Sequence, residues 1–106
     1  MRGPLFTWKM APRETGLRAI FAGPRSHALW MRNDAGDTRI RVATVSALRR
    51  GYETVGWYWV ARADDLGIPL LNSCGKPAST VDEAKAQARA YVAKCLAAAA
   101  AAARKA

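Results

Sequence analysis

Short apolar or alternating runs, separated by residues typical of turns, occur along the first two thirds of the chain, and they predict β-strands. The clearest run is Thr38–Val42, where β-branched Ile40 and Val42 alternate with polar residues. Residues 33–37 (NDAGD) have the composition of a tight hairpin turn. We therefore predict an antiparallel sheet of four or five strands, drawn from the runs Leu17–Ala22, His27–Arg32, Thr38–Val42, Trp57–Ala63 and Pro69–Ser73.

Two further segments are assigned less directly. Ser46–Arg50, followed by Gly51, fits either a single helical turn that the glycine ends or a connecting loop. Residues 1–16 contain glycines and prolines without a clear period, so we expect an N-terminal arm there, anchored by Leu5, Phe6 and Trp8. Residues 17–106 are then expected to form a single domain.

From about residue 81 the pattern changes to the period of a helix. Thr80 followed by Glu83 matches a capping box at a helix start. The run Ala97–Ala103 has a high helix propensity and can extend the helix beyond its packed part. One apolar stripe follows at steps of three and four residues, formed by Val81, Ala84, Ala88, Tyr91, Val92, Cys95 and Leu96. The predicted fold class is α+β, with the sheet packed on this one long C-terminal helix.

The stretch GWYWVARAD, residues 56–64, places three aromatic residues in a row. Neighbouring residues of a strand face opposite sides, so Trp57 and Trp59 share one face. A helix with an alanine-rich stripe needs bulky residues beneath it to fill the space. We therefore predict that both tryptophans pack under the helix, rather than forming an exposed platform for nucleic-acid bases.

Tyr58 and Arg62 then lie on the opposite face of the sheet, where Arg39 and Arg41 are expected to join them from a neighbouring strand. An aromatic ring can stack one base while guanidinium groups hold phosphates. The alternative is a solvated face with scattered arginines. The first interpretation makes these four residues candidates for binding nucleic acid.

The overall charge favours a polyanionic partner. The 106 residues carry a formal net charge of +9, and the isoelectric point is near 10.4. Such a charge attracts nucleic acid or an acidic protein surface. Arg49 and Arg50, beside Gly51, could present two charges at a loop tip to either kind of partner.

Residues with catalytic or metal-binding patterns are sparse in the sequence. No nucleophile with a base, no paired carboxylates and no glycine-rich phosphate loop occur at recognised spacing, so we expect no enzymatic activity. An enzyme built around His27 is the remaining alternative. Cys74 and Cys95 do not form a metal-binding pair, so we expect reduced thiols, no metal and no cofactor. No apolar run is long enough to span a membrane, and we expect a cytoplasmic protein.

Residues 57–96 resemble a pattern found in small proteins of phages and mobile elements: an aromatic strand, a turn, a second strand, and a helix that begins T-x-x-E-A at Thr80. This group includes anti-CRISPR inhibitors and other host-takeover proteins. The resemblance implies a phage protein that engages nucleic acid or a nucleic-acid-handling host complex. The alternative that it implies is an inhibitor that binds an acidic surface of a host complex without contacting nucleic acid. The segment is also similar to the end of a double-stranded RNA-binding domain, which has lysines where this chain has Asp82 and Glu83.

Overall fold

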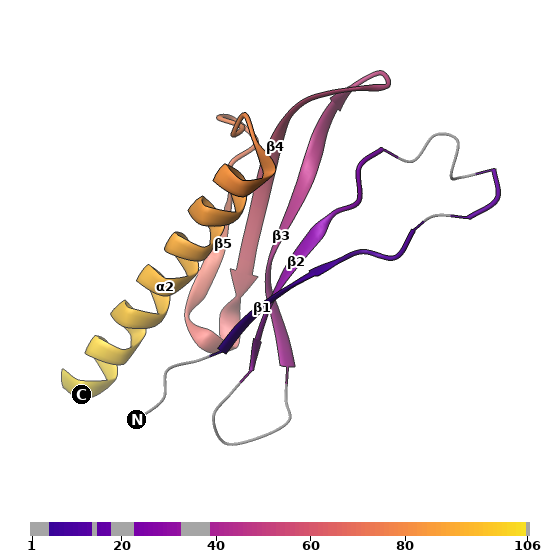
Figure 1. Cartoon of the computed structure of the whole chain (residues 1–106). Helices are drawn as coiled ribbons and strands as arrows, with labels where there is room; N and C mark the ends of the chain where they lie inside the picture. Colours follow the sequence, from indigo (N-terminus) through magenta and orange to yellow (C-terminus); the bar gives the residue numbers. More distant parts are fainter. Residues whose placement is uncertain (1–4, 14, 18–22, 33–38, 106) are drawn as a thin grey trace.

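The computed structural model describes residues 5–13, 15–17, 23–32 and 39–105. This part of the chain forms a five-stranded antiparallel sheet and one long helix, which confirms the predicted α+β fold (Figure 1). The strands lie in the sheet in the order of the sequence. The elements are β1 (Leu5–Met10), β2 (His27–Arg32), β3 (Arg39–Arg50), β4 (Glu53–Ala63), a 3₁₀ turn η1 (Asp64–Leu66), β5 (Ile68–Asn72) and α2 (Val81–Lys105).

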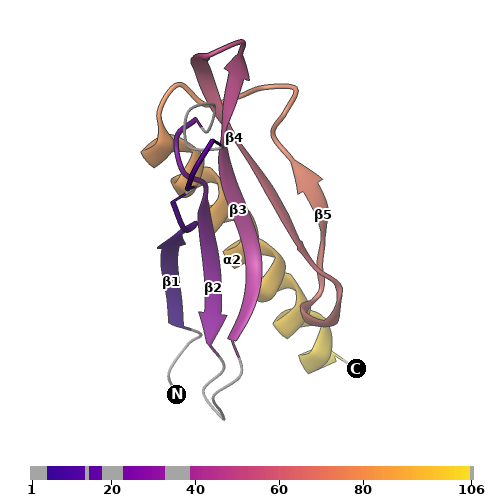
Figure 2. The ribbon, with the colours of Figure 1, turned by 90° about the vertical axis from the view of Figure 1, so that its right-hand side faces the viewer.

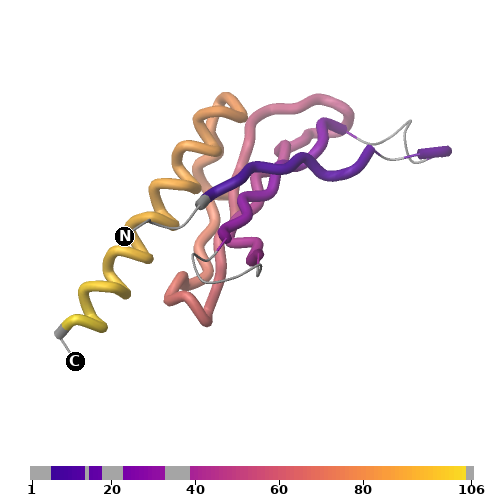
Figure 3. The backbone as a smooth tube through the Cα atoms, turned by 60° about the horizontal axis from the view of Figure 1, so that its bottom comes forward, coloured from indigo at the N-terminus to yellow at the C-terminus, as the bar shows by residue number. Residues whose placement is uncertain are grey.

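Helix α2 covers one face of the sheet, where it packs mainly on β3, β4 and β5 (Figure 3). We term this side the helix face. The opposite side, termed the open face, is not covered by any described helix, and α2 lies behind the sheet when this side is viewed in Figure 2. The two faces therefore have different roles, because only one of them builds the core.

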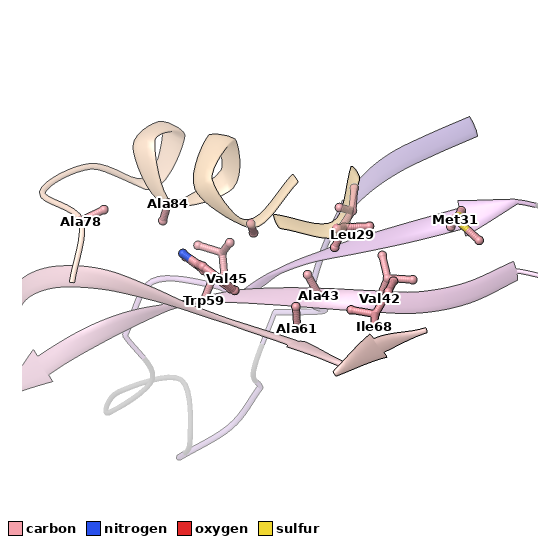
Figure 4. Packing of buried hydrophobic residues seen from close by; sticks show 12 residues of the cluster. Leu29, Met31, Val42, Ala43, Val45, Trp59, Ala61, Ile68, Ala78 and Ala84 are labelled. Carbon is pink, nitrogen blue, oxygen red and sulfur yellow. The ribbon is translucent and has the colours of Figure 1, made fainter. Parts of the chain in front are cut away.

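The core lies between the helix face and α2, and Figure 4 shows its packing. Ala84, Ala88 and Val92 are fully buried on α2, and their small side chains let the helix approach the sheet closely. Trp59 fills the space beneath them with 7% of its surface exposed. Its ring lies 5.4 Å from that of Tyr91, measured between ring centres. The small alanines of the helix and the large tryptophan of the sheet therefore fill the space between the two layers together.

The structure confirms that Trp57 and Trp59 both face the helix side. Trp59 donates its indole N–H to Oε1 of Gln87 at 3.2 Å, so its buried polar group is satisfied. Trp57 is half-buried and packs against the edge of the core. Its backbone exchanges two hydrogen bonds with Ala78, of 2.8 and 2.7 Å. These bonds tie the segment before α2 to β4.

Strand β3 contains a β-bulge near its start. Leu29 of β2 pairs with Ala43, but the next residue, Trp30, pairs with Arg41, so Val42 is the extra residue on β3. Val42 and Ala43 both point into the core, with 1% and 3% of their surfaces exposed. The bulge therefore reverses the alternation of β3 between its two halves.

This reversal decides where the arginines at the start of β3 point. On a regular strand, residues two apart share a face. Without the bulge, Arg41 and Arg39 would share the helix face with buried Ala43, where two unpaired guanidinium groups would cost several kcal/mol each. With the bulge, both side chains are exposed on the open face.

The N-terminal segment differs from the expected arm, because Leu5–Met10 forms strand β1 and pairs with β2 along its whole length. The physical reason is visible in its pattern, since Phe6 and Trp8 alternate with polar Thr7 and Lys9. Phe6 and Trp8 pack against the core from this edge of the sheet. The segment is thus a half-buried edge strand.

Residues 46–50 form neither the helical turn nor the loop considered above. They continue β3 to Arg50, where Gly51, with a φ of +64°, and Tyr52 turn the chain into β4. Only glycine adopts this left-handed backbone at little cost. Because β3 and β4 pair on both sides of it, Gly51 forms part of a hairpin turn and does not end a helix. The β3–β4 hairpin is therefore much longer than the two short predicted strands.

Two predicted elements fall wholly or mostly outside the described residues. The turn at 33–37 lies outside the described residues, and so does the predicted strand Leu17–Ala22 except for Leu17, which lies in a turn.

The predicted strand Pro69–Ser73 corresponds to β5, which is an edge strand, as the proline at its second position requires.

The start of α2 has one half of the predicted capping box, in which Thr80 caps the helix, while the Glu83 side chain bonds to Ser79. The backbone N–H of Glu83 donates to Oγ1 of Thr80 at 3.1 Å. The carboxylate of Glu83 accepts a hydrogen bond of 3.0 Å from the hydroxyl of Ser79. Asp82 and Glu83 also place negative charge in the first turn, where the helix dipole favours it.

Candidate nucleic-acid interface

Strand pairing brings cationic and aromatic residues together on the open face, the side of the sheet that is turned to the viewer in Figure 2. Trp30 of β2 pairs with Arg41 of β3, and Arg32 pairs with Arg39. Arg62 of β4 lies near Arg41, because both line the same hollow. All four arginines are exposed, whereas Trp30 is half-buried. We term Arg32, Arg39, Arg41 and Arg62 the open-face arginines.

Tyr58 supplies a second aromatic ring on this face. It is half-buried and lies opposite Ser46, since its neighbours Trp57 and Trp59 face the helix side. From the rise along a strand and the spacing between strands, Tyr58 and Trp30 are about 16 Å apart. The open-face arginines lie closer to Trp30 than to Tyr58, so the two rings stand at different ends of the candidate interface.

Two hollows lie beside these residues in the described part of the chain. The larger hollow, of about 260 Å³, is lined by Arg41, Val42, Ala43, Thr44, Val60 and Arg62. A smaller hollow of about 110 Å³ lies beside Trp30, and its lining includes Thr7, Lys9, Met31, Arg32 and Arg39. Each hollow therefore combines cationic groups with hydroxyl and apolar surface.

Arg62 already holds an anion. Its guanidinium donates to both carboxylate oxygens of Asp64, with N···O distances of 3.0 to 3.4 Å. The hydrogen bond and the charge of Asp64 raise the pKa of Arg62, whose guanidinium is positively charged in either case. The two side chains are 60% and 66% exposed. The pair is thus a solvent-exposed ion pair at the edge of the larger hollow.

Arg49 and Arg50 lie apart from this cluster, although the sequence made them candidates. They end β3, about 30 Å along the strand from Arg41. Arg49 is half-buried over Gly23, where an added Cβ would lie 2.6 Å from its side chain, and it donates to the carbonyl of Tyr52 at 3.3 Å. Arg50 is exposed opposite Glu53. The structure therefore brings Arg39, Arg41, Arg62 and Tyr58 onto one face, but not this pair.

Sequence reasoning missed Trp30 and Arg32 as members of the interface. Both were within a predicted strand, and alternation in HALWMR places Ala28, Trp30 and Arg32 on one side. On the other side of the strand, Leu29 and Met31 belong to the core, and His27 is half-buried beside Trp57. This signal was present, but it required deciding which side of the strand faced the helix.

Two cations of α2 lie over aromatic rings of β1. The ammonium of Lys85 lies 5.3 Å from the centre of the Trp8 ring, and the guanidinium of Arg89 lies 5.4 Å from that of Phe6. Through these two long side chains α2 contacts β1 at the edge of the sheet. The helix face is therefore less suited than the open face to binding a polyanion.

His27 lies on the helix face, away from the open-face arginines. Its ring meets that of Trp57 edge-on, with 6.2 Å between ring centres. Among the described residues, no cluster of three or more histidine, cysteine or acidic side chains could hold a metal ion. Nor does the described part contain a helix long and apolar enough to cross a bilayer.

Comparisons of the chain with known protein families, with curated proteins and with solved structures find no match. The function of the chain therefore has to be inferred from its own residues and their arrangement.

Proposed function

We propose that this chain is a non-enzymatic binding protein that holds single-stranded nucleic acid on the open face of its sheet. The proposal rests on one observation: Trp30, Tyr58 and four arginines lie on the same face of the sheet, and no described helix covers that face. Stacking on an aromatic ring contributes about 1 to 3 kcal/mol per base, and arginines supply the contacts to phosphate. Both parts of such a site are thus available on one surface.

Single strands suit this surface better than duplexes. In a duplex the base faces are stacked on each other, so aromatic side chains on a broad sheet cannot reach them. Bases of a single strand can turn outward and lie on Trp30 and Tyr58. With about 16 Å between these rings, one strand crossing β2, β3 and β4 diagonally would contact both rings and pass beside Arg41 and Arg62. Arg32 and Arg39 lie beyond Trp30, where they could hold the next phosphates of the same strand.

The binding of fluorescent single-stranded oligonucleotides, measured by anisotropy across a range of salt concentrations, tests the proposal. Four phosphate contacts to the open-face arginines predict a slope of log affinity against log salt of about −3. Arg41→Ala should weaken binding and reduce the magnitude of the slope by about 0.7. Arg50→Ala is the matched control, because it removes the same charge from the distant end of β3 and should have a smaller effect.

Absence of binding at low salt would overturn the proposal. If a pull-down from nuclease-treated host lysate then retained a stoichiometric protein, the open-face arginines would instead match an acidic surface on that protein. That outcome would favour the inhibitor of a host complex that the sequence resemblance implies.

A further inference from the structure

The larger hollow of the open face combines features of a phosphate-binding site. Arg41 enters it from β3 and Arg62 from β4, so two permanent positive charges from different strands stand at one depression. Thr44 adds a hydroxyl group, which can donate a hydrogen bond to an anion. Val60 provides an apolar surface between them. A phosphate oxygen and a ribose carbon would therefore both find suitable neighbours here.

Asp64 shows that this site accepts an anionic oxygen pair. Its carboxylate is bound by Nε and Nη2 of Arg62, and the shortest of these distances is 3.0 Å. Carboxylate and phosphate groups are recognised by the same planar fork of arginine. Asp64 belongs to η1, directly after β4, so this internal anion is tethered two residues from the arginine that it occupies.

We propose that the hollow between Arg41 and Arg62 is a phosphodiester subsite, and that the carboxylate of Asp64 is an internal competitor which the bound phosphate replaces on Arg62. This inference rests on the proposed function. Replacing Asp64 on Arg62 requires little free energy, because an ion pair as exposed as this one contributes little to stability. Once Asp64 has left, Arg62 and Arg41 can hold one phosphate from two sides. Asp64 thus lowers the affinity of the open face for nucleic acid.

The neighbouring residue Asp65 offers a matched control. It has the same charge, is also exposed, and makes no ion pair with any residue in the described part of the chain. Asp64→Asn and Asp65→Asn therefore raise the net charge equally, but only the first weakens the hold on Arg62. The turn itself should persist in both variants, because Asp64 closes it through its backbone carbonyl, which accepts the N–H of Gly67 at 3.1 Å.

The experiment measures the affinity of each variant for a single-stranded oligonucleotide at one fixed, low salt concentration. Asp65→Asn should tighten binding only slightly, through the general change in charge. Asp64→Asn should tighten it roughly two- to five-fold more than Asp65→Asn does, the range expected for releasing an exposed ion pair. In an Arg62→Ala background the two aspartate substitutions should have equal effects.

Equal effects of the two substitutions in the otherwise unchanged protein would overturn the inference while leaving the proposed function intact. A larger effect of Asp64→Asn that persists without Arg62 would overturn it as well, because the competition would not act through that arginine. Failure of the unchanged protein to bind any oligonucleotide would instead remove the proposed function. Unfolding midpoints of all variants, measured by circular dichroism, confirm that the comparisons concern folded protein.

Discussion

His27 is the only histidine of the chain, and its surroundings disfavour its charged form. Burial lowers its pKa, and the positive charges of Lys85 and Arg25 lower it further, while Asp82 acts in the opposite direction. Its ring edge meets Trp57 on the helix face. The folded protein therefore holds His27 as a neutral side chain that packs beside the core.

This environment predicts a loss of stability in mild acid. Because the pKa of folded His27 is lower than the usual value of 6.5, the unfolded chain takes up a proton first as the pH falls. The stability that comes from keeping His27 neutral is therefore fully present above about pH 6.5. As the pH falls below this value, the free energy of unfolding decreases by at most about 1.4 kcal/mol per pH unit. Urea unfolding between about pH 7.5 and 5.5 measures it, and His27→Gln should flatten the curve. An equally steep curve for His27→Gln would contradict the prediction.

Among the elements, α2 shows how a short sequence signal fixes a boundary. Thr80 accepts the backbone N–H of Glu83, which would otherwise lack a partner within the helix. The segment before it is held to Trp57 by backbone hydrogen bonds at Ala78. The cap thus fixes where the segment that is bonded to β4 ends and where α2 begins to cross the helix face of the sheet.

Removal of this cap should have a measurable cost. We expect Thr80→Ala to reduce the free energy of unfolding by about 1 kcal/mol, because the N–H of Glu83 loses its acceptor. Thr80→Ser keeps the hydroxyl and should be close to neutral. Denaturant unfolding of both variants measures the difference, and a Thr80→Ser variant as unstable as Thr80→Ala would show that the methyl group, not the hydrogen bond, matters.

The strands show which parts of the structure could be predicted from sequence. Alternation within Trp57–Ala63 correctly separated Trp57 and Trp59, on the helix side, from Tyr58 and Arg62, because that half of β4 is regular as far as Ala61. Alternation also put Arg39 and Arg41 on one side of β3. It could not show which side, because the bulge at Val42 depends on pairing with β2 and has no signal in the local pattern. Membership of the interface therefore required the tertiary structure.

Long-range pairing also explains the other differences. The segment Leu5–Met10 has only six residues, and its status as a strand depends on β2, which follows 17 positions after its end in the chain. Arg49 looked like half of an exposed pair, but its side chain packs over Gly23. Both facts come from contacts between segments that are distant in sequence, which local propensity does not describe.

At the scale of the whole molecule, the sheet separates stability from the proposed binding function. Its helix face holds the core, including Trp59, whereas its open face gathers the exposed arginines with Trp30 and Tyr58. With a net charge of +9, the molecule attracts polyanions from a distance, and the open face supplies the short-range contacts. Substitutions on the two faces should therefore affect different measurements.

Two tryptophan substitutions test this separation directly. Trp59→Ala removes a large buried side chain and should lower the free energy of unfolding by about 3 to 5 kcal/mol. Trp30→Ala should cost far less stability, since the ring is only half-buried, but should weaken binding of a single-stranded oligonucleotide by about 1 to 3 kcal/mol through lost stacking. Denaturant unfolding and anisotropy titrations measure the two effects, and Trp30→Phe, which keeps a ring, should retain much of the affinity. If Trp30→Ala bound as tightly as the unchanged protein, the stacking role of the open face would be wrong, and its arginines alone would have to account for any binding.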